Sequence, residues 1–136
     1  MAFLALAAAL ALTGCSSSAD AAPENTSAAA TDASVIEPAE ALEQIAVTGT
    51  TVIDVRTPAE YADGHLTGAR NIDLSADTFI DPISELDRDG TYVVYCRTGA
   101  RSAEAAAWMN DLGFTDVLDA GGLSDLTDAG GTTETA

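Results

Sequence analysis

Apolar residues recur along residues 36–126 in two alternating patterns, one typical of helices and the other of buried strands. Short runs rich in β-branched and aromatic residues predict strands at residues 50–55, 69–72, 92–95 and 116–120. Apolar residues at helical spacing predict helices at residues 36–46, 58–62 and 101–112, and a short one within residues 75–88. This alternation predicts an α/β fold with a central parallel sheet of about five strands and helices on both faces.

Two of the expected helices show which face they bury. The helix at residues 36–46 carries its apolar side chains on one side, at Ala39, Leu42, Ile45 and Ala46. The helix at residues 101–112 does the same with Ala105, Trp108 and Leu112. Trp108, and Phe114 just beyond that helix, are therefore expected in the core rather than in contact with a ligand.

The N-terminal segment, residues 1–14, has the pattern of an export signal. Its apolar run of alanine, leucine and phenylalanine is too short for a membrane-spanning helix of about 20 residues. The run ends in a sequence that resembles the lipobox of bacterial lipoproteins, Leu12-Thr13-Gly14-Cys15. This resemblance implies lipidation of Cys15 and a domain anchored on the extracytoplasmic face of the cell membrane. No Lys or Arg precedes the run, so we expect either a start upstream of Met1 or inefficient export.

The rest of the chain divides into a tether, one domain and a tail. Residues 15–34 have only small and polar side chains, which cannot offset the entropy cost of folding, so we expect a disordered tether. Residues 35–131 carry enough apolar side chains for one small domain. Residues 132–136 are small and polar, and we expect them to form a flexible tail.

The charge balance excludes several classes of partner. The chain has 22 acidic residues against 5 basic ones, all of them arginine, and a formal net charge of -17. Nucleic acids and anionic membrane surfaces bind through clustered cations, so neither is an expected partner. The acidity also repels small anions unless local positive charge overrides it within a Debye length of about 8 Å. We expect a soluble monomeric domain that binds a small anion only at a locally positive site.

The sequence around Cys96 is the strongest candidate for chemistry. Cys96 follows the expected strand at residues 92–95 and Arg101 opens the expected helix, so their loop lies where open α/β sheets bind ligands. Inward-pointing amides, the helix N-terminus and the charges of Arg97 and Arg101 favour a thiolate, so we expect a lowered pKa for Cys96. Cys96 is therefore a candidate nucleophile, and we do not expect it to pair with Cys15.

Four groups of motifs, in a fixed order, give the chain a resemblance to a known family. They read Asp54-Val55-Arg56, then Glu60-Tyr61 with Gly64-His65-Leu66, Gly68-Ala69 and Asn71-Ile72, then Cys96-Arg97-Thr98-Gly99-Ala100-Arg101-Ser102, and finally Gly121-Gly122-Leu123. The ordered set resembles the single-domain rhodanese family of sulfurtransferases over residues 35–131. Leu126 stands where the family commonly has Trp, which removes side-chain volume beside the active loop.

The resemblance implies sulfur transfer without a metal or an organic cofactor. The Cys96 thiolate would attack the outer sulfur of a donor such as thiosulfate and become a persulfide held by loop amides. The persulfide would then pass its sulfur to a thiophilic acceptor. Substrate would be bound by the rest of the loop, Arg97, Thr98, Gly99, Ala100, Arg101 and Ser102. Of these, the two arginines would hold the anionic donor and the leaving sulfite, the threonine would add a hydroxyl, and the serine would cap the helix.

Three residues outside the loop would support it, Asp54, Arg56 and His65. Arg56 is expected to form a structural ion pair, with Glu60 suggested as its partner. His65 is the only histidine, and a histidine base beside a cysteine nucleophile is a known arrangement. The resemblance instead makes His65 a residue that fixes the loop.

Three other functions stay open at this point. Cysteine phosphatases also close a loop with arginine, but they place five residues between Cys and Arg, whereas four separate Cys96 from Arg101. A catalytically idle binding module is a second alternative, although such modules usually lack the cysteine. A persulfide or redox relay to a protein partner is the third, and it would use the same loop chemistry.

Overall fold

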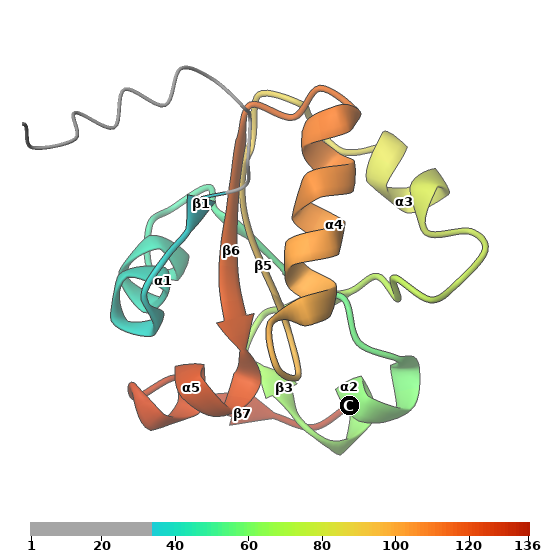
Figure 1. The fold of residues 1–136 in the computed structure, drawn as a ribbon. Helices are drawn as coiled ribbons and strands as arrows, with labels where there is room; N and C mark the ends of the chain where they lie inside the picture. The colour runs from blue at the N-terminus through green and yellow to red at the C-terminus, as the bar shows by residue number, and fades with distance from the viewer. Residues whose placement is uncertain (1–33) are drawn as a thin grey trace, which may run out of the picture.

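The computed structural model describes residues 34–136 of the chain (Figure 1). The export signal at residues 1–14, the lipidation of Cys15 and the tether up to residue 33 are predictions that lie outside the described residues. Within residues 34–136, no helix has the length and apolar character needed to cross a membrane.

Five parallel strands form the central sheet, which confirms the predicted α/β fold. The strands are β1 (Ser34–Val35), β2 (Thr51–Asp54), β4 (Arg70–Asn71), β5 (Thr91–Cys96) and β6 (Asp116–Gly122). Their order across the sheet is β1-β6-β5-β2-β4, and every neighbouring pair is parallel. β5 therefore lies at the centre, and its carboxyl end, at Cys96, has β2 on one side and β6 on the other.

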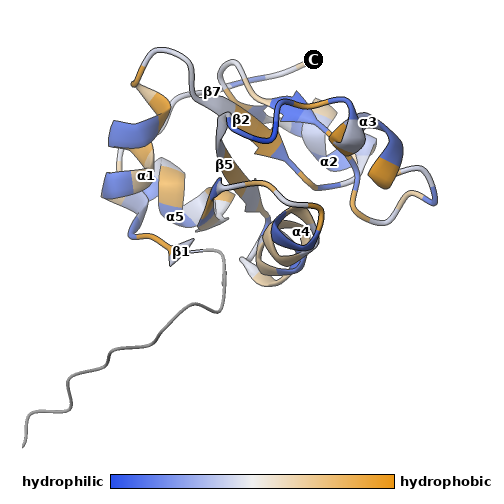
Figure 2. Cartoon of the chain, turned by 90° about the horizontal axis from the view of Figure 1, so that it is seen from above, coloured by the Kyte–Doolittle hydropathy of each residue, from blue (hydrophilic) through white to orange (hydrophobic). Residues whose placement is uncertain are grey.

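Helices cover both faces of this sheet (Figure 2). α1 (Pro38–Ile45) and α5 (Leu123–Asp128) pack on one face, and α3 (Ile80–Ser84) and α4 (Ala100–Asp111) pack on the other. Alternate residues of a strand point to opposite faces, so Tyr95 joins the core under α1 and α5, whereas Cys96 joins the core under α4. Because β5 is buried on both faces, its sequence is a continuous apolar run.

The outer face of α4 corrects one prediction. Trp108 is 49% exposed although it was expected in the core, whereas Phe114 is buried as predicted. The buried face of α4 consists mostly of small side chains, Ser102, Ala105, Ala106 and Met109. Small residues at this spacing let the helix lie close to the sheet, and Trp108 then falls on the outer side of the helix.

The buried face of α1 also differs from the prediction. Ala41 is fully buried and Leu42 and Ile45 are half-buried, whereas Ala39 and Ala46 are exposed. α1 begins at Pro38 and ends at Ile45, so Ala46 is the C-cap residue and turns away from the sheet. Alanine is too small and too common in this chain to mark the buried face by itself.

The C-terminal residues form a strand in place of the predicted flexible tail. β7 (Thr133–Glu134) pairs antiparallel with β3 (His65–Leu66) in a separate two-stranded sheet. The backbone N–H of Gly68 also donates to Glu134 Oε1 at 2.9 Å. A strand of two residues has too little sequence pattern to be predicted. This pairing brings the end of the chain beside α2 (Pro58–Asp63), which lies at the carboxyl end of the central sheet (Figure 1).

Candidate active site

Cys96 lies where the central strand meets the helix that follows it. It is the last residue of β5 and is fully buried, and α4 begins at Ala100. Gly99 has a φ of 99°, a left-handed conformation that glycine adopts without the steric cost of a side chain. This conformation turns the chain back over the thiol, and the backbone N–H of Gly99 donates to Cys96 Sγ at 3.0 Å.

Hydrogen bonds to the sulfur lower the pKa of Cys96. Burial is the largest single influence and raises the pKa, because it disfavours the charged thiolate. It is outweighed by the backbone N–H groups of Ser102, Thr98 and Gly99 together with the Ser102 hydroxyl. The sequence analysis named the loop amides, the helix N-terminus and the charges of Arg97 and Arg101 together, and in the structure the amides and the Ser102 hydroxyl are the main groups that lower the pKa of Cys96.

Ser102 occupies a different place from the one predicted. The N-cap of α4 is Gly99, and Ser102 is the third residue of the helix, so its side chain is not the cap. Its buried Oγ donates to the carbonyl oxygens of Gly99 at 2.9 Å and Gly121 at 3.3 Å. A hydroxyl proton rotates freely between acceptors, so it can turn from these carbonyls to a thiolate.

Replacing Ser102 with alanine is expected to raise the pKa of the Cys96 thiol. The variant loses the hydroxyl donor but keeps the backbone amides, so the titration midpoint moves up without returning to the ordinary value of 9.0. The rate of alkylation by iodoacetamide, followed against pH, measures that midpoint. Ser84→Ala, an exposed position at the end of α3, is the matched control. An unchanged midpoint in Ser102→Ala would assign the low pKa to the backbone alone.

The loop after Cys96 packs on two glycines at the end of β6. A Cβ atom on Gly122 would lie 2.8 Å from the carbonyl oxygen of Arg97, which is closer than such atoms approach. A Cβ atom on Gly99 would in turn contact the Cα of Gly121 at 3.5 Å. The Gly121-Gly122 motif therefore lets two backbones meet and holds the loop in place.

A buried ion pair supports the neighbouring strand. Arg56 Nη2 lies 2.6 Å from Asp54 Oδ2 and donates to the Gly64 carbonyl at 2.7 Å. The hydroxyl of Tyr95 donates to the same Asp54 oxygen at 2.7 Å and accepts from the Leu66 N–H at 3.0 Å. Burial and the adjacent carboxylate raise the pKa of Tyr95, so it stays a donor. Arg56 forms a structural ion pair as predicted, but with Asp54 rather than Glu60.

Glu60 pairs instead with the arginine of the loop. Its two oxygens each accept from Arg101 at 2.8 Å, a bidentate arrangement. Glu60 also closes a capping box with Thr57 at the start of α2. The Arg101 hydrogen bonds lower the pKa of Glu60 to about 2, helped by Thr57 and opposed by partial burial. Arg101 is therefore already engaged, whereas the sequence predicted that it would hold the donor.

His65 makes contacts that fix the turn after α2. Its Nδ1 lies 2.9 Å from the Tyr61 carbonyl oxygen, and its ring stacks on the Tyr61 ring with centroids 3.6 Å apart. Its Nε2 lies 3.6 Å from Glu134 Oε1. Both ring nitrogens therefore face the turn and the C-terminal strand, an arrangement suited to a structural residue.

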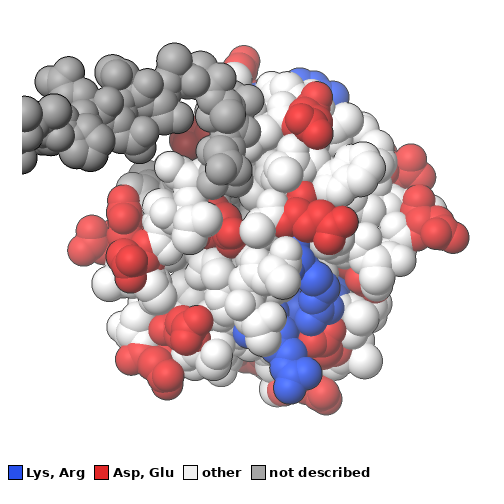
Figure 3. Space-filling view, in the orientation of Figure 1, with Lys and Arg blue, Asp and Glu red and all other residues white. Residues whose placement is uncertain are grey.

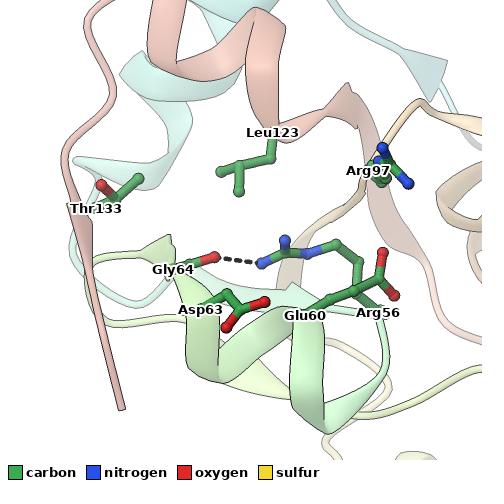
Figure 4. A pocket seen from close by; sticks show the side chains of 7 residues that line it. All are labelled: Arg56, Glu60, Asp63, Gly64, Arg97, Leu123 and Thr133. Carbon is green, nitrogen blue, oxygen red and sulfur yellow. Dashed lines mark hydrogen bonds between the residues drawn. The ribbon is translucent and has the colours of Figure 1, made fainter.

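A pocket of about 470 Å³ opens beside the loop. It is lined by Arg56, Glu60, Asp63, Gly64, Arg97, Leu123 and Thr133. Figure 4 shows the carboxylates of Glu60 and Asp63 extending from α2 and the side chain of Leu123 extending from α5. Arg97 lies on the loop, across the pocket from Asp63. A second hollow of about 450 Å³ shares Arg56, Arg97 and Leu123 with the first and is also lined by Thr98, Ser124 and Thr127. In Figure 3 the basic side chains in the lower part of the visible face form a small group bordered by carboxylates.

Comparison with known proteins identifies the family. The model of the Rhodanese-like domain family matches residues 37–129. The chain is 39% identical over 87 residues to thiosulfate sulfurtransferase GlpE of Pseudomonas putida, covering 64% of this chain and 77% of the relative. The chain belongs to the rhodanese-like family. It is also 38% identical over 73 residues to thiosulfate sulfurtransferase PspE of Escherichia coli, covering 54% and 70%.

A solved structure supports the same conclusion about the fold. The rhodanese-related protein of Thermoplasma volcanium superposes with a TM-score of 0.66 at 31% identity, covering 76% of this chain and 99% of that one. The two curated relatives are named as thiosulfate sulfurtransferases, which supports a rhodanese-type sulfurtransferase at the level of the family.

The rhodanese-like site contains residues that the sequence did not single out. Asp63, Thr133 and the side chain of Leu123 line the pocket, although only Leu123 fell within a recognised motif. Thr133 reaches the pocket through the short β7 strand, which has no sequence signal. No group of three His, Cys, Asp or Glu side chains that could hold a metal ion occurs in residues 34–136.

Proposed function

We propose that this rhodanese-like domain transfers sulfane sulfur from a small anionic donor such as thiosulfate to a thiophilic acceptor through a persulfide on Cys96. The observation that carries the proposal is the Cys96 thiol, whose pKa is lowered by amides pointing into a loop at the N-terminus of α4. A sulfur nucleophile needs the thiolate form, and this loop favours that form without a separate base.

The first half of the reaction loads the cysteine. The Cys96 thiolate attacks the outer sulfur of thiosulfate and forms a new S–S bond, while the S–S bond of the donor breaks and sulfite leaves with its electron pair. The product is a Cys96 persulfide anion, and the total charge of the products equals that of the reactants. The charge now sits about 2 Å further from Cβ, at the end of an S–S bond, where loop amides can donate to it.

The second half returns the thiolate. A nucleophilic acceptor attacks the outer sulfur, the S–S bond to Cys96 breaks, and the Cys96 thiolate leaves with the electron pair. Arg97 is the cation placed to hold the anionic donor, because it is exposed and makes no ion pair within residues 34–136. Arg101 takes part only where the donor competes with Glu60 for its guanidinium.

The experiment that tests this proposal measures turnover of thiosulfate and cyanide to sulfite and thiocyanate. A phosphate ester and mercaptopyruvate, tried in parallel, decide between a sulfurtransferase, a phosphatase and a different donor. Turnover of the ester alone would favour the phosphatase. Failure with every small donor, together with a reactive low-pKa thiol, would favour a relay that takes sulfur from a protein partner.

The proposal extends to the location of the enzyme. Cleavage before Cys15 and its lipidation would anchor the domain on the extracytoplasmic face of the cell membrane, with the tether holding the domain off the surface. Expressed in a bacterial host, the chain is expected to sediment with membranes and to incorporate labelled palmitate. Cys15→Ser should abolish both, and labelling that persists in this variant would contradict the anchor.

A further inference from the structure

A small apolar hollow lies beside the exposed Trp108. It has a volume of about 200 Å³ and is formed by the loop before α3, the start of α3 and the outer side of α4 (Figure 1). Its apolar lining includes Leu74, Phe79, Ile80 and Trp108. None of the residues that line this hollow also lines the pocket beside the active loop. The hollow is therefore a separate feature of the surface.

The outer face of α4 has the composition of a contact surface. Charged and polar side chains normally cover the solvent side of a helix, but the exposed positions next to Trp108 include Ala103 and Ala107. Trp108 itself is 49% exposed and is the largest of the exposed large apolar side chains in residues 34–136. Tryptophan is enriched among the residues that contribute most to binding at protein interfaces. Because its neighbours are alanines, the indole ring is open to an approaching molecule.

The hollow has the size of one inserted side chain. Its volume lies below the range of about 300–1,000 Å³ that is common for small organic ligands. Its base is apolar and packed, because Phe79 is buried and the half-buried Leu74 and Ile80 pack against the same core. An aliphatic side chain from another molecule would bury apolar surface between this base and the Trp108 ring.

The only two charged residues that line the hollow are carboxylates without a partner. Asp77 and Glu104 are exposed, and within residues 34–136 neither forms an ion pair nor accepts a hydrogen bond. Glu104 precedes Trp108 by four positions in α4, so the two side chains are neighbours on the helix surface. An arginine or lysine side chain that paired with Glu104 would therefore lie near the indole ring, where cation–π attraction adds to the attraction between the charges.

This charge distinguishes between the possible occupants of the surface. Residues 1–33 contain no Lys or Arg, so they would bring no cation to the two carboxylates. A second copy of the chain has the same net charge of -17, and its approach is opposed by repulsion. A basic partner is attracted by that same charge.

We propose that the hollow and the outer face of α4 form a docking surface for a partner protein, which binds through a segment with an apolar side chain between two arginines or lysines. The apolar side chain would enter the hollow, and the basic ones would pair with Asp77 and Glu104. The inference does not depend on the proposed function, because the docking surface shares no lining residue with the pocket beside the active loop.

The fluorescence of Trp108 provides the test, because it is the only tryptophan of the chain. The full chain, produced without lipidation, is titrated with the blocked pentapeptide Gly-Arg-Leu-Arg-Gly. We expect a saturable shift of the tryptophan emission to the blue, as the peptide displaces water from the ring. The control peptides Gly-Arg-Ser-Arg-Gly and Gly-Glu-Leu-Glu-Gly should bind at least tenfold more weakly, since one lacks the apolar side chain and the other the cations. Absence of a shift, or equal affinity for the leucine and serine peptides, would overturn the inference.

A pair of variants tests the role of the carboxylates. Glu104→Gln is expected to weaken binding of the leucine peptide with arginines by about fivefold, as for an exposed ion pair. Glu43→Gln is the matched control, since Glu43 is an exposed glutamate of α1, on the opposite face of the sheet, and its replacement removes the same charge. Its dissociation constant should stay at the wild-type value. An equal loss in both variants would show only general attraction of a cationic peptide to an acidic chain, and would contradict the docking surface.

Two further measurements test the other occupants. Without peptide, the emission of Trp108 should be independent of the concentration of the chain, and a blue shift at high concentration would show that a second copy covers the ring. The double variant Phe3→Ser with Leu4→Ser should leave the emission unchanged, and a red shift would show that the N-terminal segment covers the ring. Either shift would overturn the inference, because the surface would already be occupied.

Discussion

The Cys96→Ser variant is expected to take up no sulfur from thiosulfate, whereas the wild-type chain gains one sulfur atom on the peptide that contains Cys96. Serine is nearly isosteric, so the loop and its amides stay in place, but a hydroxyl is far less acidic and less nucleophilic than this thiol, whose pKa is lowered. Thiocyanate production should fall to the rate of the buffer alone. Mass spectrometry of the intact chain and of its peptides measures the adduct, and cyanide should remove it.

The chain carries an internal control for this experiment. Cys15 is the other of its two cysteines and lies outside the predicted domain, so in chain produced without lipidation an adduct formed by general thiol reactivity would also appear there. Circular dichroism of Cys96→Ser shows whether the fold persists. Sulfur found on Cys15 alone, or an adduct that survives in Cys96→Ser, would be evidence against the persulfide mechanism.

The strand, loop and helix around Cys96 could be predicted because the signals that form them are local. A continuous apolar strand, a glycine two residues before the expected helix and a periodic helix follow one another within residues 92–112. The position of Cys96 at the carboxyl end of a central strand then follows from the general topology of parallel sheets. The structure adds the left-handed turn at Gly99, which directs the amides onto the sulfur.

The partners of the charged residues could not be predicted, because they depend on contacts between distant parts of the chain. Arg101 and Glu60 are separated by 41 positions and meet only because α2 lies against the loop. The sequence analysis therefore predicted that Arg101 binds the anionic donor, and it suggested Glu60 as the ion-pair partner of Arg56. Asp54, two residues from Arg56, was the better candidate by distance alone, but a strand pattern gives no sign of which neighbour a long side chain reaches.

The prediction for Trp108 failed for a different physical reason. Helical periodicity shows that a face is apolar, but alanine satisfies that pattern on several sides of α4. The sheet accepts the side that has the smallest residues, Ala105 and Ala106, and this leaves the largest side chain outside. The size of an apolar side chain therefore does not by itself predict its burial where a helix packs closely on a sheet, as α4 does.

Asp54→Ala is expected to destabilise the domain by about 3–5 kcal/mol, the usual effect of removing one partner of a buried ion pair. The carboxylate is fully buried and accepts hydrogen bonds from Arg56 and from the Tyr95 hydroxyl. Its loss leaves the charge of Arg56, a residue only 6% exposed, without a counter-charge. This is a large fraction of the roughly 5–15 kcal/mol that stabilises a small domain. Urea unfolding followed by circular dichroism measures the change.

Two further variants determine whether the effect comes from the buried charge. Glu60→Gln removes the charge from the Glu60–Arg101 pair but can keep the capping box with Thr57, and both side chains of that pair are about 30% exposed. It should therefore cost only about 1 kcal/mol or less. The double variant Asp54→Leu with Arg56→Met removes both buried charges and should recover part of the stability lost in Asp54→Ala, because no uncompensated guanidinium is left in the interior. If the double variant were less stable than Asp54→Ala, the hydrogen bond from Arg56 to the Gly64 carbonyl, which only the double variant loses, would contribute more to stability than removal of the uncompensated charge.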